Sequence, residues 1–167
     1  MSVGRAFCIL LVVILAVGGY MGLTALLGVR EYWAGFLFLL QWGMMEQLKI
    51  DHLPKSALGA ATGAAIAFLP AWLTPALGLV GAGAAMTVAI LAATFCLILG
   101  KAPIIVNAAT MLFLTILSIP HLAAQVRSID VYAGLAAGVL FFGGLAALAT
   151  WAQGRSAVRS RASGYAS

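Results

Sequence analysis

The sequence predicts an all-helical integral membrane protein, built as a bundle of about six transmembrane helices. Hydrophobic residues make up 64% of the 167-residue chain and charged residues only 8%, whereas an ordinary soluble domain carries about a quarter charged residues. The apolar residues also gather in six runs with short polar breaks, and each run is close to the about 20 residues that a helix needs to cross a bilayer. Since lipid offers the backbone no hydrogen-bond partners, helices are the expected structure for these runs.

The six predicted spans are 6–28, 32–49, 56–73, 77–99, 102–119 and 131–152. They form one transmembrane domain over residues 1–154, and residues 155–167 form a short basic cytoplasmic tail that is expected to be frayed and solvated. The first run follows Arg5 and is longer than the apolar segment of about 7–15 residues in a signal peptide, so it is expected to be retained as a span.

Polar or helix-breaking residues mark the start of each later run. Arg30-Glu31 precedes the second run, and "KIDHLPK" (49–55) precedes the third. "TPALG" (74–78), Gly100-Lys101 and "PHLAAQVRSID" (120–130) separate the remaining three runs. Proline, glycine and charged residues end apolar helices, so these breaks predict short loops between antiparallel neighbours.

Lysine and arginine predict the orientation, because cytoplasmic loops of membrane proteins are enriched in both. With six spans and both termini inside, two cations lie outside, Arg30 and Arg127. The other seven lie inside: Arg5, Lys49, Lys55, Lys101, Arg155, Arg159 and Arg161. The predicted orientation therefore has both termini cytoplasmic, and the lipid bilayer is the first partner.

Glycines at helical spacing predict close helix packing. Three pairs are four residues apart: Gly18 and Gly22, Gly59 and Gly63, and Gly134 and Gly138. Small residues at this spacing let two helix backbones approach each other in lipid. The sequence leaves open whether these faces pack within one chain or mediate self-association. If they mediate self-association, the chain is expected to form a homo-oligomer.

The fifth run carries the polar residues that most suggest a function. On a helical wheel, Pro103, Asn107, Thr110 and Ser118 fall on one face of the segment 102–119. Further polar residues in other runs are candidates to face this stripe: Thr87 and Thr94 in the fourth run, and Gln41 and Glu46 in the second. Glu46 lies near the inner surface and is expected to pair with Lys49 or Lys55.

Three interpretations of the stripe stay open. It is helix–helix glue, or the lining of a narrow path for a small neutral solute, or part of a broken or re-entrant segment that Pro103 delimits. A neutral lining of hydroxyl and amide groups suits an uncharged solute better than an ion. In the path interpretation, Asn107 exchanges hydrogen bonds with the solute, and Thr110, Thr87 and Thr94 extend the ladder.

Other classes of function find little support in the composition. The chain has four acids, two histidines and two cysteines, and these form no nucleophile–base set, phosphate-binding glycine loop or Cys-x-x-Cys motif. We therefore expect no enzyme, no metal and no cofactor. The nine basic residues are scattered over helix ends and the tail, so no nucleic-acid partner is predicted.

Three stretches carry a resemblance to a known family. They are "WAGFL" (33–37), "KSALGAATGAAIAFLPAW" (55–72) and "APIIVNAATMLF" (102–113), followed by a Gly/Ala-rich last span. In this order they resemble the YcdZ-like family of small six-span bacterial inner-membrane proteins, a family of unknown function. The resemblance covers nearly the whole chain through short motifs, and it implies a fold and a location in the bacterial inner membrane without an activity.

The fifth run is also similar in outline to bacterial urea transporters, in which a proline- and threonine-bearing stretch precedes a helix that lines a slot for urea. This chain departs from that pattern, because it has one proline instead of two, no threonine just before it and no phenylalanine after it. The resemblance implies only a neutral slot lined by Pro103, Asn107 and Thr110. Together these features predict a channel or permease for a small, urea-like solute. The alternatives are an accessory or structural subunit of a larger membrane complex, or a proton-coupled carrier that uses Glu46.

Overall fold

The computed structural model describes residues 3–119, 122 and 125–164, and every regular element within those residues is a helix. In chain order the elements are α1 (Val3–Leu26), α2 (Trp33–Glu46), the short 3-10 helix η1 (Ile50–His52), α3 (Leu53–Ile98), α4 (Ala108–Leu117) and α6 (Ser128–Gly164). Three stretches among them are long and apolar enough to cross a membrane: Val3–Leu26, Ile50–Ile98 and Ser128–Gln153. These features agree with the predicted all-helical membrane protein.

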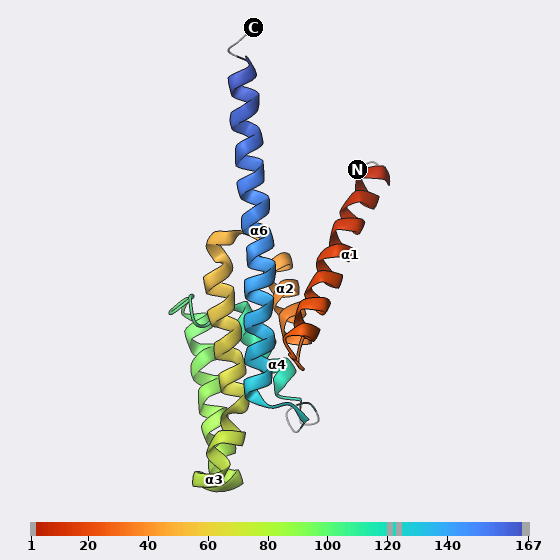
Figure 1. Ribbon diagram of the computed structural model, residues 1–167. Coiled ribbons are helices and arrows are strands. Elements are labelled where there is room, and N and C mark those ends of the chain that lie inside the picture. Colours follow the sequence, from red (N-terminus) through yellow and green to blue (C-terminus); the bar gives the residue numbers. More distant parts are fainter. Residues whose placement is uncertain (1–2, 120–121, 123–124, 165–167) are drawn as a thin grey trace.

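Helix α3 contains two of the predicted runs, and Gly78 divides it into two arms. Gly78 has φ 69° and ψ 174°, a left-handed conformation that glycine adopts without the steric penalty of a side chain. Pro70 and Pro75 precede it and weaken the helix, since a proline cannot donate the backbone hydrogen bond. The chain reverses at this end of α3 (Figure 1), so the predicted break at 74–78 is found at its last residue.

The second and fifth predicted spans are shorter than expected. Helix α2 has 14 residues and α4 has 10, which at about 1.5 Å per residue correspond to about 21 Å and 15 Å, well below the about 30 Å of a bilayer core. Helix α2 ends because Gln47 and Leu48 adopt left-handed φ values of 53° and 56°. The predicted range 32–49 is therefore too long at its C-terminal end.

The fifth run is not one helix from 102 to 119. Gly100 and Ala102 have φ values of 62° and 54°, and residues 101–107 form turns before α4 begins. Pro103 therefore lies in a loop and neither starts nor kinks a helix. A helical wheel does not apply to the part of the predicted stripe that precedes Asn107, because a helical angle has no meaning for a non-helical segment.

The last helix is longer than predicted. Helix α6 begins at Ser128 and continues to Gly164, through most of the segment predicted to be a frayed tail; residues 165–167 lie outside the described residues. One contact that supports the extension is the Arg155 guanidinium, which lies 4.0 Å from the centre of the Trp151 ring.

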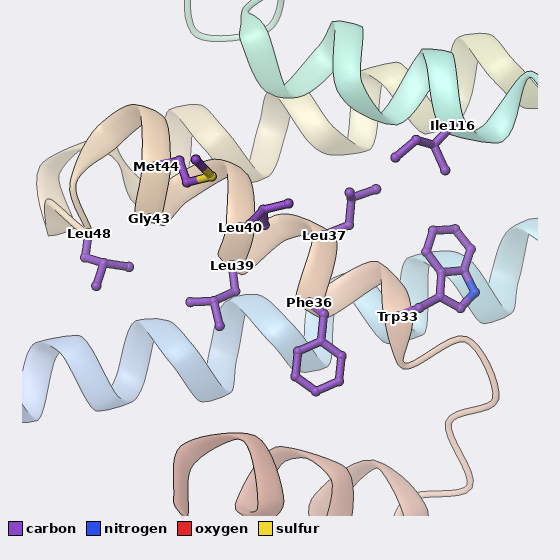
Figure 2. Close-up of a pocket in the computed structure, with 9 residues that line it drawn as sticks. All are labelled: Trp33, Phe36, Leu37, Leu39, Leu40, Gly43, Met44, Leu48 and Ile116. Atoms are coloured by element: carbon purple, nitrogen blue, oxygen red, sulfur yellow. The ribbon is translucent and has the colours of Figure 1, made fainter. Parts of the chain in front are cut away.

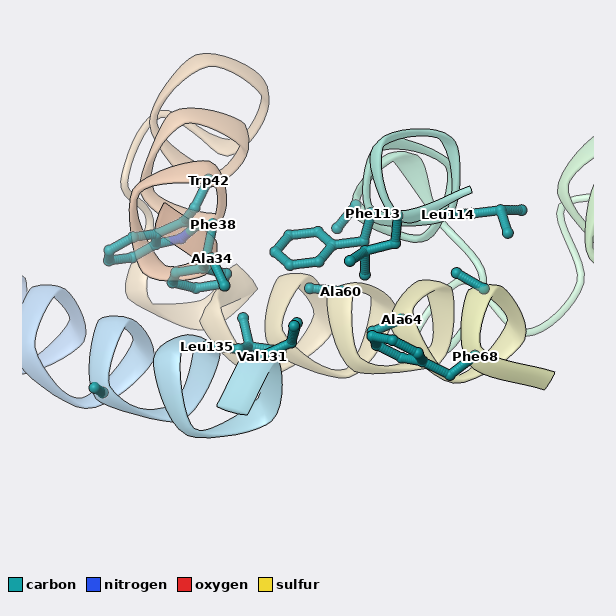
Figure 3. Packing of buried hydrophobic residues seen from close by; sticks show 14 of the residues in the cluster. Ala34, Phe38, Trp42, Ala60, Ala64, Phe68, Phe113, Leu114, Val131 and Leu135 are labelled. Carbon is teal, nitrogen blue, oxygen red and sulfur yellow. The ribbon is translucent and has the colours of Figure 1, made fainter. Parts of the chain in front are cut away.

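The core forms where α2, α3, α4 and α6 meet, and Figure 3 shows its aromatic and alanine side chains interleaved. Helices α2 and α6 cross glycine to glycine. A Cβ atom added to Gly138 would lie 2.4 Å from the Cα of Gly35, and one added to Gly134 would lie 2.0 Å from the carbonyl oxygen of Glu31. The predicted pair Gly134 and Gly138 therefore packs within the chain.

Tyr20 fixes α1 to this crossing. Its hydroxyl donates to the carbonyl oxygens of Tyr32, at 2.9 Å, and Gly134, at 3.2 Å, and its side chain is fully buried. Tyr20 and Thr24 are the buried residues of α1, both near its C-terminal end. Towards its N-terminus α1 leans away from the other helices, and both chain ends lie at the same end of the molecule (Figure 1).

Candidate functional site

A polar pocket of about 220 Å³ lies at the end of the molecule where α2 ends and α3 begins. It contains three of the residues predicted from sequence, Glu46, Pro103 and Asn107, together with the cations Lys55 and Lys101. Cys96, Leu97, Gly100, Val106 and Ala108 complete the lining. The loop between α3 and α4 brings these groups together, so this pocket is the candidate site.

Asn107 is the N-cap of α4, and its side chain is committed to the fold. Its Oδ1 accepts a hydrogen bond of 2.9 Å from the backbone N–H of Ala109. Its Nδ2 donates to the carbonyl oxygens of Lys55, at 2.9 Å, and Pro103, at 3.2 Å. Asparagine is among the best N-caps because its side-chain oxygen satisfies an unpaired N–H of the first turn. The donor and acceptor that the path interpretation assigns to a solute are therefore already used.

Thr110 closes the same motif. Its hydroxyl accepts from the backbone N–H of Asn107 at 3.0 Å and donates to the carbonyl oxygen of Ile105 at 2.9 Å. Together Asn107 and Thr110 form a capping box, in which each side chain satisfies the backbone near the other. Both side chains are more than nine-tenths buried, so the pair anchors α4 inside the bundle.

Two glycines of α3 make room for this anchor. A Cβ atom at Gly59 would lie 2.2 Å from Oδ1 of Asn107, and one at Gly63 would lie 2.3 Å from the carbonyl oxygen of Thr110. The predicted small-residue pair Gly59 and Gly63 therefore lets α4 approach the backbone of α3.

Glu46 forms the charged side of the pocket, as the last residue of α2 at the polar end of that helix. Its carboxylate accepts a hydrogen bond of 3.2 Å from Nζ of Lys55 and also contacts Nδ1 of His52. The predicted pairing with Lys55 is confirmed, whereas the contact with His52 was missed.

Lys101 differs from Lys55 in having no ion pair among the described residues. It is exposed on the loop before Pro103, and the salt bridges at this end of the described chain join Glu46 to Lys55 and to His52. With Glu46 already neutralised by Lys55, Lys101 leaves the pocket with a net positive charge.

The remaining hydroxyl groups of the predicted path do not reach this pocket. Thr87 and Thr94 are exposed, and each hydroxyl donates to the carbonyl oxygen four residues earlier in its own helix. Ser118 does the same towards Leu114, at 2.6 Å. Within the described chain these residues are not brought together with Asn107 and Thr110, so the predicted face shared by the fourth and fifth runs does not form.

Gln41 lies apart from the pocket, in a groove that α2 forms with α4. Its side chain is only 4% exposed, and its Oε1 has no hydrogen-bond partner among the described residues. Ser56, at the start of α3, is buried with its hydroxyl also unpartnered in that part of the chain. Ser56 was not among the residues expected from sequence, because a serine in the first turns of a helix is an ordinary occurrence.

Comparisons of the chain with protein-family models, with curated proteins and with solved structures give no match. The resemblance to the YcdZ-like family stays a prediction.

Proposed function

We propose that this chain is a structural subunit of a membrane assembly and that it docks through the face of α1 that points away from its own bundle. The observation that carries the proposal is a contrast among three glycine pairs of equal spacing. Gly59 and Gly63 pack against α4, and Gly134 and Gly138 pack against α2, whereas a Cβ atom added to Gly18 or Gly22 would have no neighbouring atom within 4 Å. Two of the three glycine pairs thus pack against a helix of the same chain, whereas the pair on α1 contacts no other helix.

The position of this pair on α1 supports an outside partner. At 100° per residue, Gly18 and Gly22 each lie about 160° from Tyr20, the residue that attaches α1 to α2 and α6. The glycine face is therefore opposite to the attached face. In lipid, small residues at this spacing allow the close backbone approach that drives helix association, so a helix from another subunit fits this face.

The proposed topology has six crossings with both termini cytoplasmic in a bacterial inner membrane. The two arms of α3 supply two crossings, α1 and α6 supply two, and the shorter α2 and α4 complete the set with their adjoining loops. The arrangement of the cations supports this topology. Lys55 and Lys101 share one pocket, whereas the start of α2 and the start of α6, which Arg30 and Arg127 precede in the sequence, lie at the other end of the molecule (Figure 1).

The size of the purified particle tests the docking face. Purified in mild detergent from its native membrane together with its partner, the wild type should run as a particle larger than one 17.2 kDa chain, and Gly22→Leu should run as a single chain. A Cβ atom at this exposed helical position has no neighbouring atom within 4 Å, and leucine has a higher helix propensity than glycine, so the fold should persist. Light scattering coupled to size-exclusion chromatography gives the protein mass.

Gly144→Leu is the matched control, since Gly144 is also an open, exposed glycine but lies on α6. It should leave the particle size unchanged. A wild type that is a single chain, or equal masses for wild type and Gly22→Leu, would refute the docking face.

A second candidate is the predicted permease for a small polar solute. One observation favours it: Glu46, Pro103 and Asn107 line a common pocket. Flux of urea-sized solutes into liposomes that contain the purified protein would support it. The proton-coupled variant is weaker, because the Glu46 carboxylate is held in an ion pair with Lys55 and also contacts His52.

A further inference from the structure

A long apolar groove, here called the α2–α4 groove, runs along α2 and is bordered by α4, which contributes Ile116 to its larger hollow and several residues to its smaller one. It consists of two hollows of about 640 Å³ and 510 Å³ that share Leu40 and Met44. Figure 2 shows the larger hollow, with Leu37 and Leu40 of α2 and Ile116 of α4 around it. Apart from Gln41 and Thr115, the groove is lined by apolar side chains and glycine or alanine.

The length of the groove fits one leaflet of a bilayer. On α2 its lining extends from Trp33 to Met45, which is about 18 Å along a helix. One leaflet contributes about 15 Å, half of the hydrocarbon core. A single acyl chain lying parallel to α2 would therefore fill the groove over its whole length.

The end of the groove near Met45 opens towards the polar pocket. Ala108, the first residue of α4, lines both the groove and the pocket. Beyond Ala108 lie Lys101, which has no ion pair among the described residues, and Lys55, which is paired with Glu46. An apolar channel thus ends at a site with net positive charge.

Gln41 adds a polar contact inside the groove. It is more than nine-tenths buried, it lines the hollow next to Ala108, and its Oε1 is unpartnered in the part of the chain that the structure describes. Oε1 is an acceptor, which an ester cannot satisfy because an ester has no hydrogen-bond donor, but an ester carbonyl at this depth would accept from the Nε2 N–H of the same amide.

We propose that the α2–α4 groove and the polar pocket together bind one anionic phospholipid from the leaflet at the Lys101 end. The phosphate contacts Lys101, an ester carbonyl accepts from Gln41, and one acyl chain lies between α2 and α4. The Glu46 carboxylate would repel a phosphate, but its charge is compensated by Lys55. A zwitterionic lipid would bring its own cation towards Lys101, which disfavours it relative to a lipid with net negative charge.

Native mass spectrometry with defined lipids tests the site. The purified protein is titrated with dioleoylphosphatidylglycerol and, separately, with dioleoylphosphatidylcholine. We expect one phosphatidylglycerol to bind tightly and phosphatidylcholine to bind with about fivefold lower affinity. This ratio is the effect expected of one surface cation on the binding of an anionic lipid. Lys101→Gln should weaken phosphatidylglycerol about fivefold and leave phosphatidylcholine unchanged.

Further variants distinguish lipid binding at this site from non-specific electrostatic attraction to the protein. Arg30→Gln removes a cation at the opposite end of the molecule and should leave the lipid affinity as in the wild type. Ala108→Phe places a ring where the groove joins the pocket, at an exposed position, and should abolish the tight binding of either lipid. Gly22→Leu should bind phosphatidylglycerol normally, which makes this test independent of the docking face.

The proposal is overturned by equal affinity for the two phospholipids, by equal effects of Lys101→Gln and Arg30→Gln, or by oleate binding as tightly as phosphatidylglycerol. The last result would assign the groove to a free fatty acid.

Discussion

Gly138→Ala should destabilise the protein by about 1–3 kcal/mol, the range for overpacking a tight contact, with a result near the upper end. The added methyl group would lie 2.4 Å from Cα and 3.1 Å from the carbonyl carbon of Gly35. Both atoms belong to the backbone, so no rotamer change relieves the clash, and α2 and α6 must separate. Denaturant titration in detergent, followed by circular dichroism, measures the loss.

Gly144→Ala provides the internal comparison on the same helix. Its added methyl group meets no atom within 4 Å, and alanine is favoured over glycine in a helix by about 1 kcal/mol. This variant should therefore be neutral or stabilising. If both alanine variants unfold at the same denaturant concentration, α2 and α6 do not cross at these glycines.

Asn107→Leu should destabilise the protein by about 2–4 kcal/mol. Loss of an N-cap side chain accounts for about 1 kcal/mol, and the buried N–H of Ala109 and carbonyl of Lys55 lose their partners, at about 1–3 kcal/mol. Thermal unfolding of the purified variant measures this loss. The same loss makes Asn107→Leu unsuitable as a test of solute flux, since a drop in flux would follow from misfolding alone.

Two threonines of α4 give a matched pair of variants for the capping box. Thr110→Val removes its second half and should lower stability by at least about 1 kcal/mol. Thr115→Val removes an exposed hydroxyl that bonds only to its own helix, and should change stability by less than about 0.5 kcal/mol. Equal losses in the two variants would contradict the structural role of the capping box.

The sequence predicted the helical class and the positions of most helices because long apolar runs and charged breaks are strong signals. It placed the reversal near Gly78 for the same reason, since prolines and a glycine coincide there. It failed at Gln47, Leu48 and Ala102, which adopt left-handed conformations although none is glycine or asparagine. No local sequence pattern predicts a left-handed conformation at such residues, because their backbone conformation depends on tertiary contacts.

The interpretation of Asn107 shows how a readable signal was misassigned. Asparagine followed three residues later by threonine is a helix-start pattern, but the apolar stretch before it concealed a loop, because residues 102–106 are as hydrophobic as a helix interior. The helical wheel therefore placed Pro103 on a helix that does not exist. The sequence also shows the three glycine pairs, but it does not show which pairs face helices of the same chain and which pair faces away from the bundle. Only the fold distinguishes them.

The most direct test of the docking face is photo-crosslinking from position 22 in the native membrane. A photoreactive amino acid replaces Gly22 in one protein and Gly144 in another, and the products are separated by mass. We expect a crosslinked protein partner from position 22, either a second copy or another subunit, and none from position 144. Lipid adducts alone from position 22 would contradict the docking face.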